Sequence, residues 1–262
     1  FMLQKTISAG HYYMAADYSG EQVRIADNEQ VCFDLNGYTF YGTEARAFYL
    51  EANTTTALSI MDSSKAQTGV VKALGGSIGA PNGYGGKTVF VGKKATLNLY
   101  SGTLTGAEKG NHSVYAGGVL FIRGTFNMYG GKIVGSTVSS FTGQCLKSGV
   151  PTDMERAASG GAIESSGTLN LYGGQIISGS GQRITGTVIG SEELGYAYSQ
   201  TVEPVEIKDP GVTVLTGGAV NLGGDCSVED IYFTDGISGK LTLHGIYTGA
   251  MEITYPEETS VG

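Results

Sequence analysis

Three copies of a five-residue pattern carry the side chains best suited to bind a ligand. They read TLNLY (96–100), TFNMY (125–129) and TLNLY (168–172). Alternate residues of a strand share a face, so the Asn and Tyr of each copy lie opposite the two apolar residues. Rings and amides on one face suit sugars, whose C–H groups pack on rings while amides bond hydroxyls. The predicted glycan-binding residues are Asn98, Asn127, Asn170, Tyr100, Tyr129 and Tyr172. The alternative is that these residues only stabilise neighbouring strands.

A second set of residues suits acid–base chemistry. Phe121, Glu164 and Asn221 are predicted to share one outward column, with Arg123 close by. A carboxylate and a guanidinium together fit a lyase, which neutralises a uronate and removes a proton next to it. Glu164 and Arg123 are therefore the candidate catalytic residues. An ordinary surface ion pair is the competing interpretation.

Other catalytic and metal-binding patterns add no site. GGSIG (75–79) spells a nucleophile elbow around Ser77, but turn sequence follows where that motif needs a helix. The three His and three Cys are scattered without metal-ligand spacing. We therefore expect no cofactor and no metal centre, and loop carboxylates are the remaining place for a weak calcium site.

Composition indicates turn-rich β structure with an acidic surface. Gly accounts for 43 of 262 residues, Pro for 5 and apolar residues for 40%, which is unlike a disordered chain. The net charge is −8 and the basic residues are dispersed, so nucleic acid and anionic membranes are not expected partners. No apolar run approaches the ~18 residues of a membrane helix. The sequence has no basic-then-apolar leader, which leaves a cytosolic protein, a mature secreted protein or an excised domain, and the initial Phe1 favours the last two.

Glycine pairs mark a longer repeat that would position these side chains. Its copies are GGVLFIRGTFNMYGGKIVGS (117–136), GGAIESSGTLNLYGGQIISGS (160–180) and the divergent GGAVNLGGDCSVEDIYFTDG (217–236). Each reads as three short strands with glycine at the corners, and the first Gly precedes the middle strand by the same interval. Short strands recurring at a fixed phase predict a solenoid whose rungs pair about 4.8 Å apart.

The predicted fold is an all-β, right-handed, single-stranded parallel β-helix of about 6–8 rungs. Six rungs are predicted from equivalent positions, each of which we take as the phase point of its rung, near the first apolar residue of its middle strand. These phase points are residues 33, 58, 97, 126, 169 and 226. We expect residues 1–22 to form an N-terminal cap, residues 23–245 the β-helix, and residues 246–262 a C-terminal cap or a junction to a further domain. Surplus residues near 62–76, 136–159 and 179–214 are predicted long loops, where binding functions are commonly placed.

The N-terminal segment resembles a known family. YYMAADYSGEQVRIADNEQVCFDLNGYTFYG (12–42) followed by ALSIMDSS (57–64) is similar to the first rungs of pectin-lyase-like right-handed parallel β-helices in large secreted or surface proteins of Gram-positive gut bacteria. The resemblance spans roughly residues 10–250 and implies this fold and an extracellular or cell-surface location. The fold hosts lyases, hydrolases, esterases, adhesins and spacers, so the activity stays open. The family's usual catalytic Asp sets are not found in this sequence.

Three functions follow from these observations. The first hypothesis is a non-catalytic module for adhesion or carbohydrate binding, with a polysaccharide or a host or cell-surface glycan as partner. The second is a polysaccharide-active enzyme, of the lyase or glycoside hydrolase type. The third is a structural spacer. We expect neighbouring domains of a larger protein as further partners, and no nucleic acid and no membrane insertion.

Overall fold

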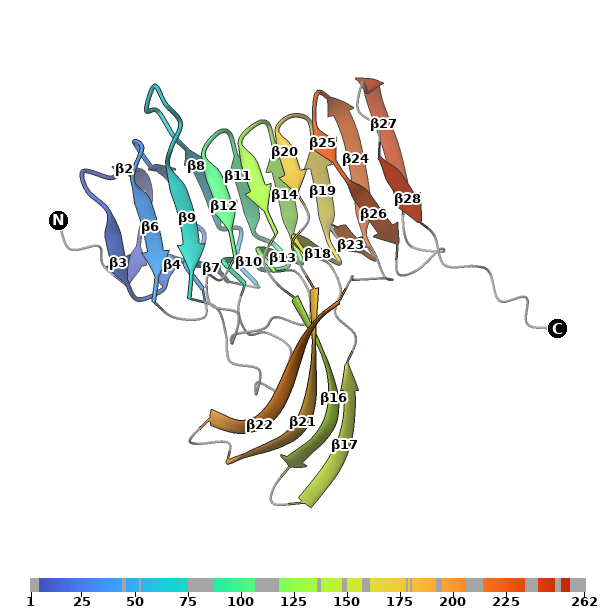
Figure 1. Cartoon of the computed structure of the whole chain (residues 1–262). Helices are drawn as coiled ribbons and strands as arrows, with labels where there is room; N and C mark the ends of the chain where they lie inside the picture. The colour runs from blue at the N-terminus through green and yellow to red at the C-terminus, as the bar shows by residue number, and fades with distance from the viewer. Residues whose placement is uncertain are drawn as a thin grey trace.

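The computed structural model is a parallel β-helix built from short strands (Figure 1). It describes residues 5–43, 46–51, 53–74, 87–106, 118–135, 138–147, 150–156, 161–177, 179, 181–191, 195–205, 214–233, 240–247 and 251–254. Every regular element within these ranges is a strand, which confirms the predicted all-β class. None of the described residues forms a helix that could span a membrane.

Three parallel sheets form the sides of the β-helix, and each complete rung contributes one strand to each sheet. Sheet A contains β1 (Thr6–Ile7), β4 (Val23–Ile25), β7 (Phe48–Leu50), β10 (Val89–Val91), β13 (Leu120–Ile122), β18 (Ile163–Ser165), β23 (Val214–Thr216), β26 (Asp230–Phe233) and β28 (Glu252–Thr254). Sheet B contains β2 (Gly10–Tyr13), β5 (Gln30–Asp34), β8 (Ala57–Met61), β11 (Thr96–Leu99), β14 (Thr125–Met128), β19 (Thr168–Leu171), β24 (Ala219–Gly224) and β27 (Lys240–Tyr247). Sheet C contains β3 (Tyr18–Gly20), β6 (Thr39–Gly42), β9 (Val70–Ala73), β12 (Thr103–Thr105), β15 (Lys132–Val134), β20 (Gln175–Ile177) and β25 (Ser227–Val228). The described residues thus complete seven three-stranded rungs, which agrees with the predicted parallel β-helix.

Apolar residues that alternate along the strands form continuous buried rows inside the β-helix. Leu97 pairs with Phe126, and Phe126 pairs with Leu169, on adjacent parallel strands. All three are 0% exposed. Full burial of a side chain of this kind contributes about 1.5–3 kcal/mol. The predicted stacking of like residues in successive rungs is therefore confirmed for this row.

Glycine occupies the corners because neighbouring backbones approach closely there. Gly167 lies between β18 and β19, and a Cβ at this position would meet the carbonyl oxygen of Gly124 in the preceding rung. At the corner between sheets B and C, Gly131 and Gly174 have φ angles of 78° and 90°. These left-handed conformations favour glycine, which has no Cβ to clash.

The predicted register of the third repeat copy is wrong. The sequence pattern matches the glycine pair at 217–218 with the pairs that precede β13 and β18. In the structure Gly218 instead packs against Gly167, and Val220 pairs with Leu169. Cys226 therefore does not stack on Leu169. The reason is that β23, the sheet A strand of this rung, precedes the glycine pair instead of following it.

The predicted alignment of residue 33 with residue 58 is wrong by two residues. Val31, and not Phe33, pairs with Leu58, while Phe33 pairs with Ile60. Val31 and Phe33 are both buried, and so is Leu35 immediately after the strand. Apolar alternation thus identifies the buried face correctly but does not fix the register.

Two of the predicted long loops contain paired strands that form a separate sheet D. Its order is β17 (Val150–Arg156), β16 (Val138–Lys147), β21 (Gly181–Ser191) and β22 (Gly195–Val205). β16 and β21 are parallel, and each forms an antiparallel hairpin with the strand that follows it. Figure 1 shows this sheet extending away from the β-helix on the side of β13 and β18. The third predicted loop, near 62–76, likewise includes a strand, β9.

Parallel pairing extends into both predicted terminal segments. β1, β2 and β3 lie within residues 1–22 and pair with β4, β5 and β6. At the other end β28 pairs with β26. The stacked strands of the β-helix therefore begin before residue 23 and continue beyond residue 245.

Candidate functional site

The outer face of sheet B carries a regular array of neutral side chains across three consecutive rungs. We name it the Thr–Asn–Tyr strip, and it consists of Thr96, Asn98, Tyr100, Thr125, Asn127, Tyr129, Thr168, Asn170 and Tyr172. β11, β14 and β19 pair in parallel with Thr opposite Thr and Asn opposite Asn. The structure therefore brings together the six residues that the sequence singled out, and it adds a column of threonines.

The asparagines of the strip form a hydrogen-bonded ladder. Nδ2 of Asn127 donates to Oδ1 of Asn98 at 2.7 Å, and Nδ2 of Asn170 donates to Oδ1 of Asn127 at 2.6 Å. The ladder includes Asn221, which donates to Asn170 at 2.6 Å, and it ends where Asn98 donates to the hydroxyl of Ser59 at 3.1 Å. An Asn side chain has two N–H donors and two acceptor lone pairs. The ladder uses one of each in the central residues and leaves the others for a further partner.

The tyrosines of the strip stack on one another. The ring centres of Tyr100 and Tyr129 are 5.0 Å apart with an interplanar angle of 15°. Tyr129 and Tyr172 are 6.1 Å apart at 32°, and His244 packs edge-on against Tyr172. Stacked rings cover each other's faces, so the column presents mainly ring edges and phenol hydroxyls. Tyr100 and Tyr129 are still 49% and 47% exposed. The expected packing of sugars on open ring faces is therefore restricted, while hydroxyl contacts are favoured.

The outer face of sheet A holds the candidate catalytic residues, and one predicted neighbour is wrong. Phe121 pairs with Glu164 as predicted, and Glu164 pairs next with Leu215 of β23. Asn221 belongs instead to the asparagine ladder of sheet B. The error follows from the register of the third repeat copy, which assigned β24 to the wrong sheet.

Glu164 is engaged with a buried lysine that sequence reasoning missed. Nζ of Lys87 lies 2.8 Å from Oε2 of Glu164 and 3.9 Å from the ring centre of Phe121. The side chain of Lys87 is 2% exposed and that of Glu164 is 29% exposed. Burial lowers the pKa of Lys87; the Glu164 carboxylate opposes this shift, and Arg46 and Arg123 add to it. The sequence around Lys87 gives no signal for a pairing with Glu164, which lies 77 residues away along the chain.

Cations and aromatic rings form a packed layer around this pair. The guanidinium of Arg123 lies 5.2 Å from the Phe121 ring, and that of Arg46 lies 5.4 Å and 5.5 Å from the rings of Tyr49 and Phe90. Phe90 and Phe121 are only 5% and 7% exposed although they lie on the outer side of the sheet. Cation–π contacts of this kind stabilise by ~0.5–2 kcal/mol. The geometry accounts for Glu164 as the partner of a buried cation, and its role in catalysis stays a prediction.

The one buried carboxylate among the described residues organises a turn. Asp62 accepts hydrogen bonds from the backbone N–H groups of Gly37, Ser64 and Gly69 at 2.8, 3.0 and 2.5 Å. Burial raises the pKa of Asp62, but these hydrogen bonds outweigh that effect and leave the pKa below its ordinary value. Asp62 thus stabilises the connection from β8 to β9. The Asp-Ser-Ser sequence after a strand is a signal for such a turn.

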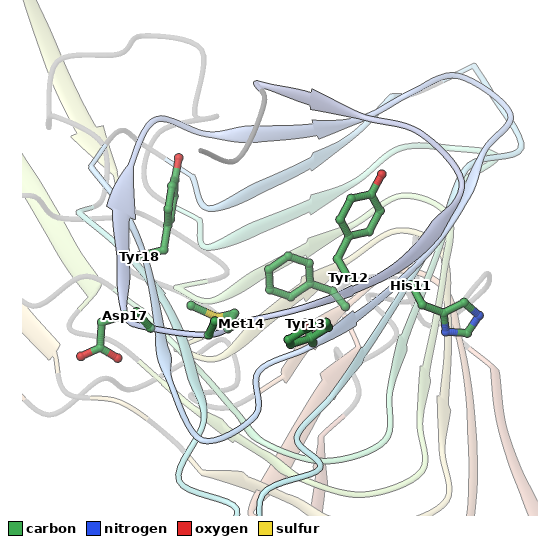
Figure 2. Close-up of a pocket in the computed structure, with 9 residues that line it drawn as sticks. His11, Tyr12, Tyr13, Met14, Asp17 and Tyr18 are labelled. Carbon is green, nitrogen blue, oxygen red and sulfur yellow. The ribbon is translucent and has the colours of Figure 1, made fainter. Parts of the chain in front are cut away.

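A hollow of about 320 Å³ lies at the N-terminal end of the β-helix (Figure 2). Its lining includes Tyr12, Met14, Tyr18 and Phe33. Figure 2 shows the side chains of Tyr12, Met14 and Tyr18 inside the first turn of the chain. Phe33 packs in turn on Phe40 of the next sheet. The hollow is therefore the end of the apolar interior and not a groove across the rungs.

The described part of the chain was compared with two further kinds of site, a metal-binding cluster and a reactive thiol, and neither is present among these residues. No group of three or more His, Cys, Asp and Glu residues is placed there to hold a metal ion. Burial, with a smaller effect of Asp225, raises the pKa of Cys226 to about 12, which suppresses its thiolate. The GGSIG segment around Ser77 lies outside the described residues.

No family model, curated protein or solved structure matches this chain. The function is therefore inferred from the geometry of the two outer faces.

Proposed function

We propose that this chain is a non-catalytic, pectin-lyase-like β-helix module that binds carbohydrate or mediates adhesion on a bacterial surface or secreted protein. The observation that carries the proposal is the Thr–Asn–Tyr strip. Three successive rungs present the same three hydrogen-bonding side chains in register. The repeat suits a ligand that itself repeats, such as a linear polysaccharide lying along the axis of the β-helix.

Hydrogen-bonding capacity supports a hydroxyl-rich ligand. The Thr and Tyr hydroxyls both donate and accept, and each central Asn retains one donor and one acceptor position beyond the ladder. Sugar hydroxyls likewise donate and accept. The ladder already fixes the amides in one orientation, so ligand binding costs less side-chain entropy than it would with free amides.

The charge of the strip favours a neutral polysaccharide. The strip consists only of Thr, Asn and Tyr, so it lacks the guanidinium and ammonium groups that pair with carboxylates or sulfates. The chain also carries a net charge of −8, which disfavours the approach of polyanions. Xylans, mannans and neutral glucans are accordingly better candidates than polyuronates.

The sheet A face supports the lyase alternative less well. Lys87, Phe90 and Phe121 are nearly inaccessible to solvent, and the Glu164 carboxylate forms an ion pair with Lys87. A proton-abstracting base at this position would first have to leave that buried cation. Binding through sheet B requires no such rearrangement.

A panel of neutral linear polysaccharides and polygalacturonate tests the proposal. We expect isothermal titration calorimetry to detect binding of a neutral polymer, with affinity that rises with oligosaccharide length until three rungs are spanned. Tyr129→Ala and Asn127→Ala should each weaken it by about tenfold, since interface residues of this kind contribute ~1–2 kcal/mol. Tyr13→Ala is the matched control, because Tyr13 is 75% exposed but lies outside the strip.

Three results would reject the glycan-binding assignment. Equal losses in Tyr129→Ala and Tyr13→Ala would show that binding is not confined to the Thr–Asn–Tyr strip. Failure to bind any polymer would favour the hypothesis that the chain is a structural spacer. Double-bond absorbance appearing from polygalacturonate, and disappearing in Glu164→Gln, would establish the lyase instead.

A further inference from the structure

The amides of the asparagine ladder can be reversed only as a unit. Asn127 donates through Nδ2 to Asn98 and accepts at Oδ1 from Asn170. If one amide exchanged the places of its N–H and oxygen groups, it would face one neighbour with two donors and the other with two acceptors. Each neighbour would then have to reverse as well. The ladder therefore has two self-consistent orientations, and the groups at its two ends decide between them.

The N-terminal end of the ladder fits both orientations. The hydroxyl of Ser59 accepts a hydrogen bond from Nδ2 of Asn98 at 3.1 Å. A hydroxyl carries one donor and two acceptor positions, and its hydrogen rotates to suit its partner. The same hydroxyl would donate to Oδ1 of a reversed Asn98 equally well. Ser59 therefore does not select an orientation.

The C-terminal end of the ladder is chemically different, because it is a histidine. Nε2 of His244 lies 3.3 Å from Oδ1 of Asn221. Asn221 donates through Nδ2 to Asn170 at 2.6 Å, so the oxygen that faces His244 can only accept. The contact is therefore a hydrogen bond only when Nε2 carries a proton. A reversed ladder needs the opposite, an unprotonated Nε2 that accepts from Asn221.

The backbone at this end brings the ring of His244 to the ladder. His244 pairs with Gly223, which occupies in its rung the position that Tyr172 occupies in the preceding one. A Cβ at Gly223 would lie 2.6 Å from the carbonyl oxygen of His244 and 3.3 Å from Cδ1 of Tyr172. The ring of His244 instead packs edge-on against Tyr172, with the ring centres 6.3 Å apart. Glycine thus leaves the room through which His244 ends both columns.

We propose that His244 is a positioning residue of the Thr–Asn–Tyr strip, whose protonated ring holds the asparagine ladder in the orientation that the structure shows. Both nitrogens of an imidazolium carry protons, so Nε2 can only donate. A neutral ring carries one proton, and the form with that proton on Nδ1 fits the reversed ladder. Histidine side chains change charge between about pH 5 and 8. The amides should therefore be most uniformly oriented at acidic pH.

One carboxylate near His244 offers a competing source of pH dependence. Within the described part of the chain, the ionisable residues around His244 are Tyr172 after β19, Asp225 after β24, and Lys240 and Tyr247 on β27. Tyr247 packs against the apolar core. Oδ1 of Asp225 lies beside Gly173, which follows Tyr172, and a Cβ at Gly173 would be 3.1 Å from it. Asp225 is the group that a test has to separate from the ladder.

The consequence for ligand binding is modest. If both orientations are equally populated once the proton is lost, half of the molecules present the amides as a ligand of the other half requires. Apparent affinity then falls about twofold. This consequence, unlike the reorientation itself, rests on the proposed glycan binding. Because the ring of His244 is exposed to solvent, its protonation should leave the free energy of unfolding almost unchanged.

Nuclear magnetic resonance of the 15N-labelled protein tests the reorientation without any ligand. The side-chain amide signals of Asn98, Asn127, Asn170 and Asn221 should shift or broaden together between pH 5 and 8, along the titration curve of the His244 ring. His244→Gln, which does not titrate, should abolish this response. His244→Arg, which can only donate, should keep the acidic-pH signals at pH 8. The matched control His11→Gln and the variant Asp225→Asn should leave the response unchanged.

Calorimetry with a neutral polysaccharide then separates this inference from the proposed function. We expect the wild type to bind about twofold more weakly at pH 8 than at pH 5, and His244→Arg to bind equally at both. Amide signals that move together in a protein that binds no polymer would support the role of His244 and reject glycan binding.

Three results would overturn the role of His244. The first is a set of amide signals that does not follow the His244 titration, even in a protein that binds a polymer. The second is a response confined to Asn221, which would reduce the contact to a local one. The third is a response that disappears in Asp225→Asn, because pairing of His244 with that carboxylate would then be its cause.

Discussion

Sheets A and B stack residues at the same rung spacing, yet their outer faces have opposite characters. On sheet B the column residues are neutral and Tyr100 and Tyr129 remain about half exposed. On sheet A the corresponding layer combines Lys87 with Phe90 and Phe121, and all three are nearly inaccessible. Sheet A thus carries a second small packed layer outside the main core, whereas sheet B leaves an ordered polar surface open to partners.

This difference shows that regular stacking alone does not create a binding surface. Both faces place aromatic rings one rung apart, with 5.0 Å between Tyr49 and Phe90 on sheet A and between Tyr100 and Tyr129 on sheet B. The two faces differ in the ion pair between the buried Lys87 and Glu164, which helps to exclude solvent from the outer face of sheet A. Four variants and conditions test how far the contrast holds.

The largest effect is expected at the corner on which both faces depend. Gly167→Ala should lower the free energy of unfolding by about 3 kcal/mol, because the new Cβ meets the carbonyl of Gly124 and overpacked sites cost ~1–3 kcal/mol or more. Urea denaturation measures it. Ser166→Ala is the control, since Ser166 is its exposed neighbour. Equal stability of the two variants would contradict the view that sheets A and B both depend on close backbone packing at this corner.

The buried pair of sheet A should give the next largest effect. Glu164→Ala leaves the buried Lys87 without this carboxylate, and we expect a loss of about 2 kcal/mol, below the 3–5 kcal/mol of a fully buried pair because Glu164 is partly solvated. Lys87→Met replaces the cation with an apolar chain of similar length and should cost less. Urea denaturation of both variants compares them. A larger loss in Lys87→Met would contradict the view that Glu164 neutralises a buried charge.

The ladder of sheet B should contribute less to stability. Asn127→Ala removes the acceptor of Asn170 and the donor to Asn98. Because water reaches this face, we expect a loss of about 1 kcal/mol, typical of exchanged hydrogen bonds. Thr125→Ala, in the same strand but outside the ladder, provides the comparison. A loss as large as that of Glu164→Ala would mean that sheet B is built for stability in the same way as sheet A.

The smallest effect is a pH dependence confined to sheet A. Burial lowers the pKa of Lys87 below its ordinary value of 10.5. The unfolded chain therefore binds this proton more tightly, and the contribution of Lys87 to stability increases as pH rises from the lowered pKa toward 10.5. The stability of the wild type relative to Lys87→Met should grow over this window by less than ~1.4 kcal/mol per pH unit. A difference that does not change with pH would contradict it.

Local sequence patterns were sufficient to predict the rungs but not all of their registers. Leu97, Phe126 and Leu169 stack as expected because alternation and corner glycines recur at one spacing in those rungs. Around Phe33 the buried residues continue past the strand, so two registers satisfy the same pattern. The glycine pair at 217–218 was ambiguous for a related reason, because glycine serves more than one corner.

The candidate sites show the same limit. The asparagine and tyrosine columns were predictable because neighbours one rung apart have the same residue type. The role of Lys87 was not predictable from the sequence. Its side chain reaches Glu164 across the intervening Phe121, and no short-range pattern encodes this contact. The paired strands of sheet D were also missed, because parallel pairing of β16 with β21 joins residues of two separate insertions.

The asparagine ladder has a direction. Each amide donates toward the N-terminal rung, from Asn221 through Asn170, Asn127 and Asn98 to Ser59. The side-chain dipoles therefore add instead of cancelling, and the two extremities of the row differ chemically. A polymer with a reducing and a non-reducing terminus would bind to such a row with one preferred polarity.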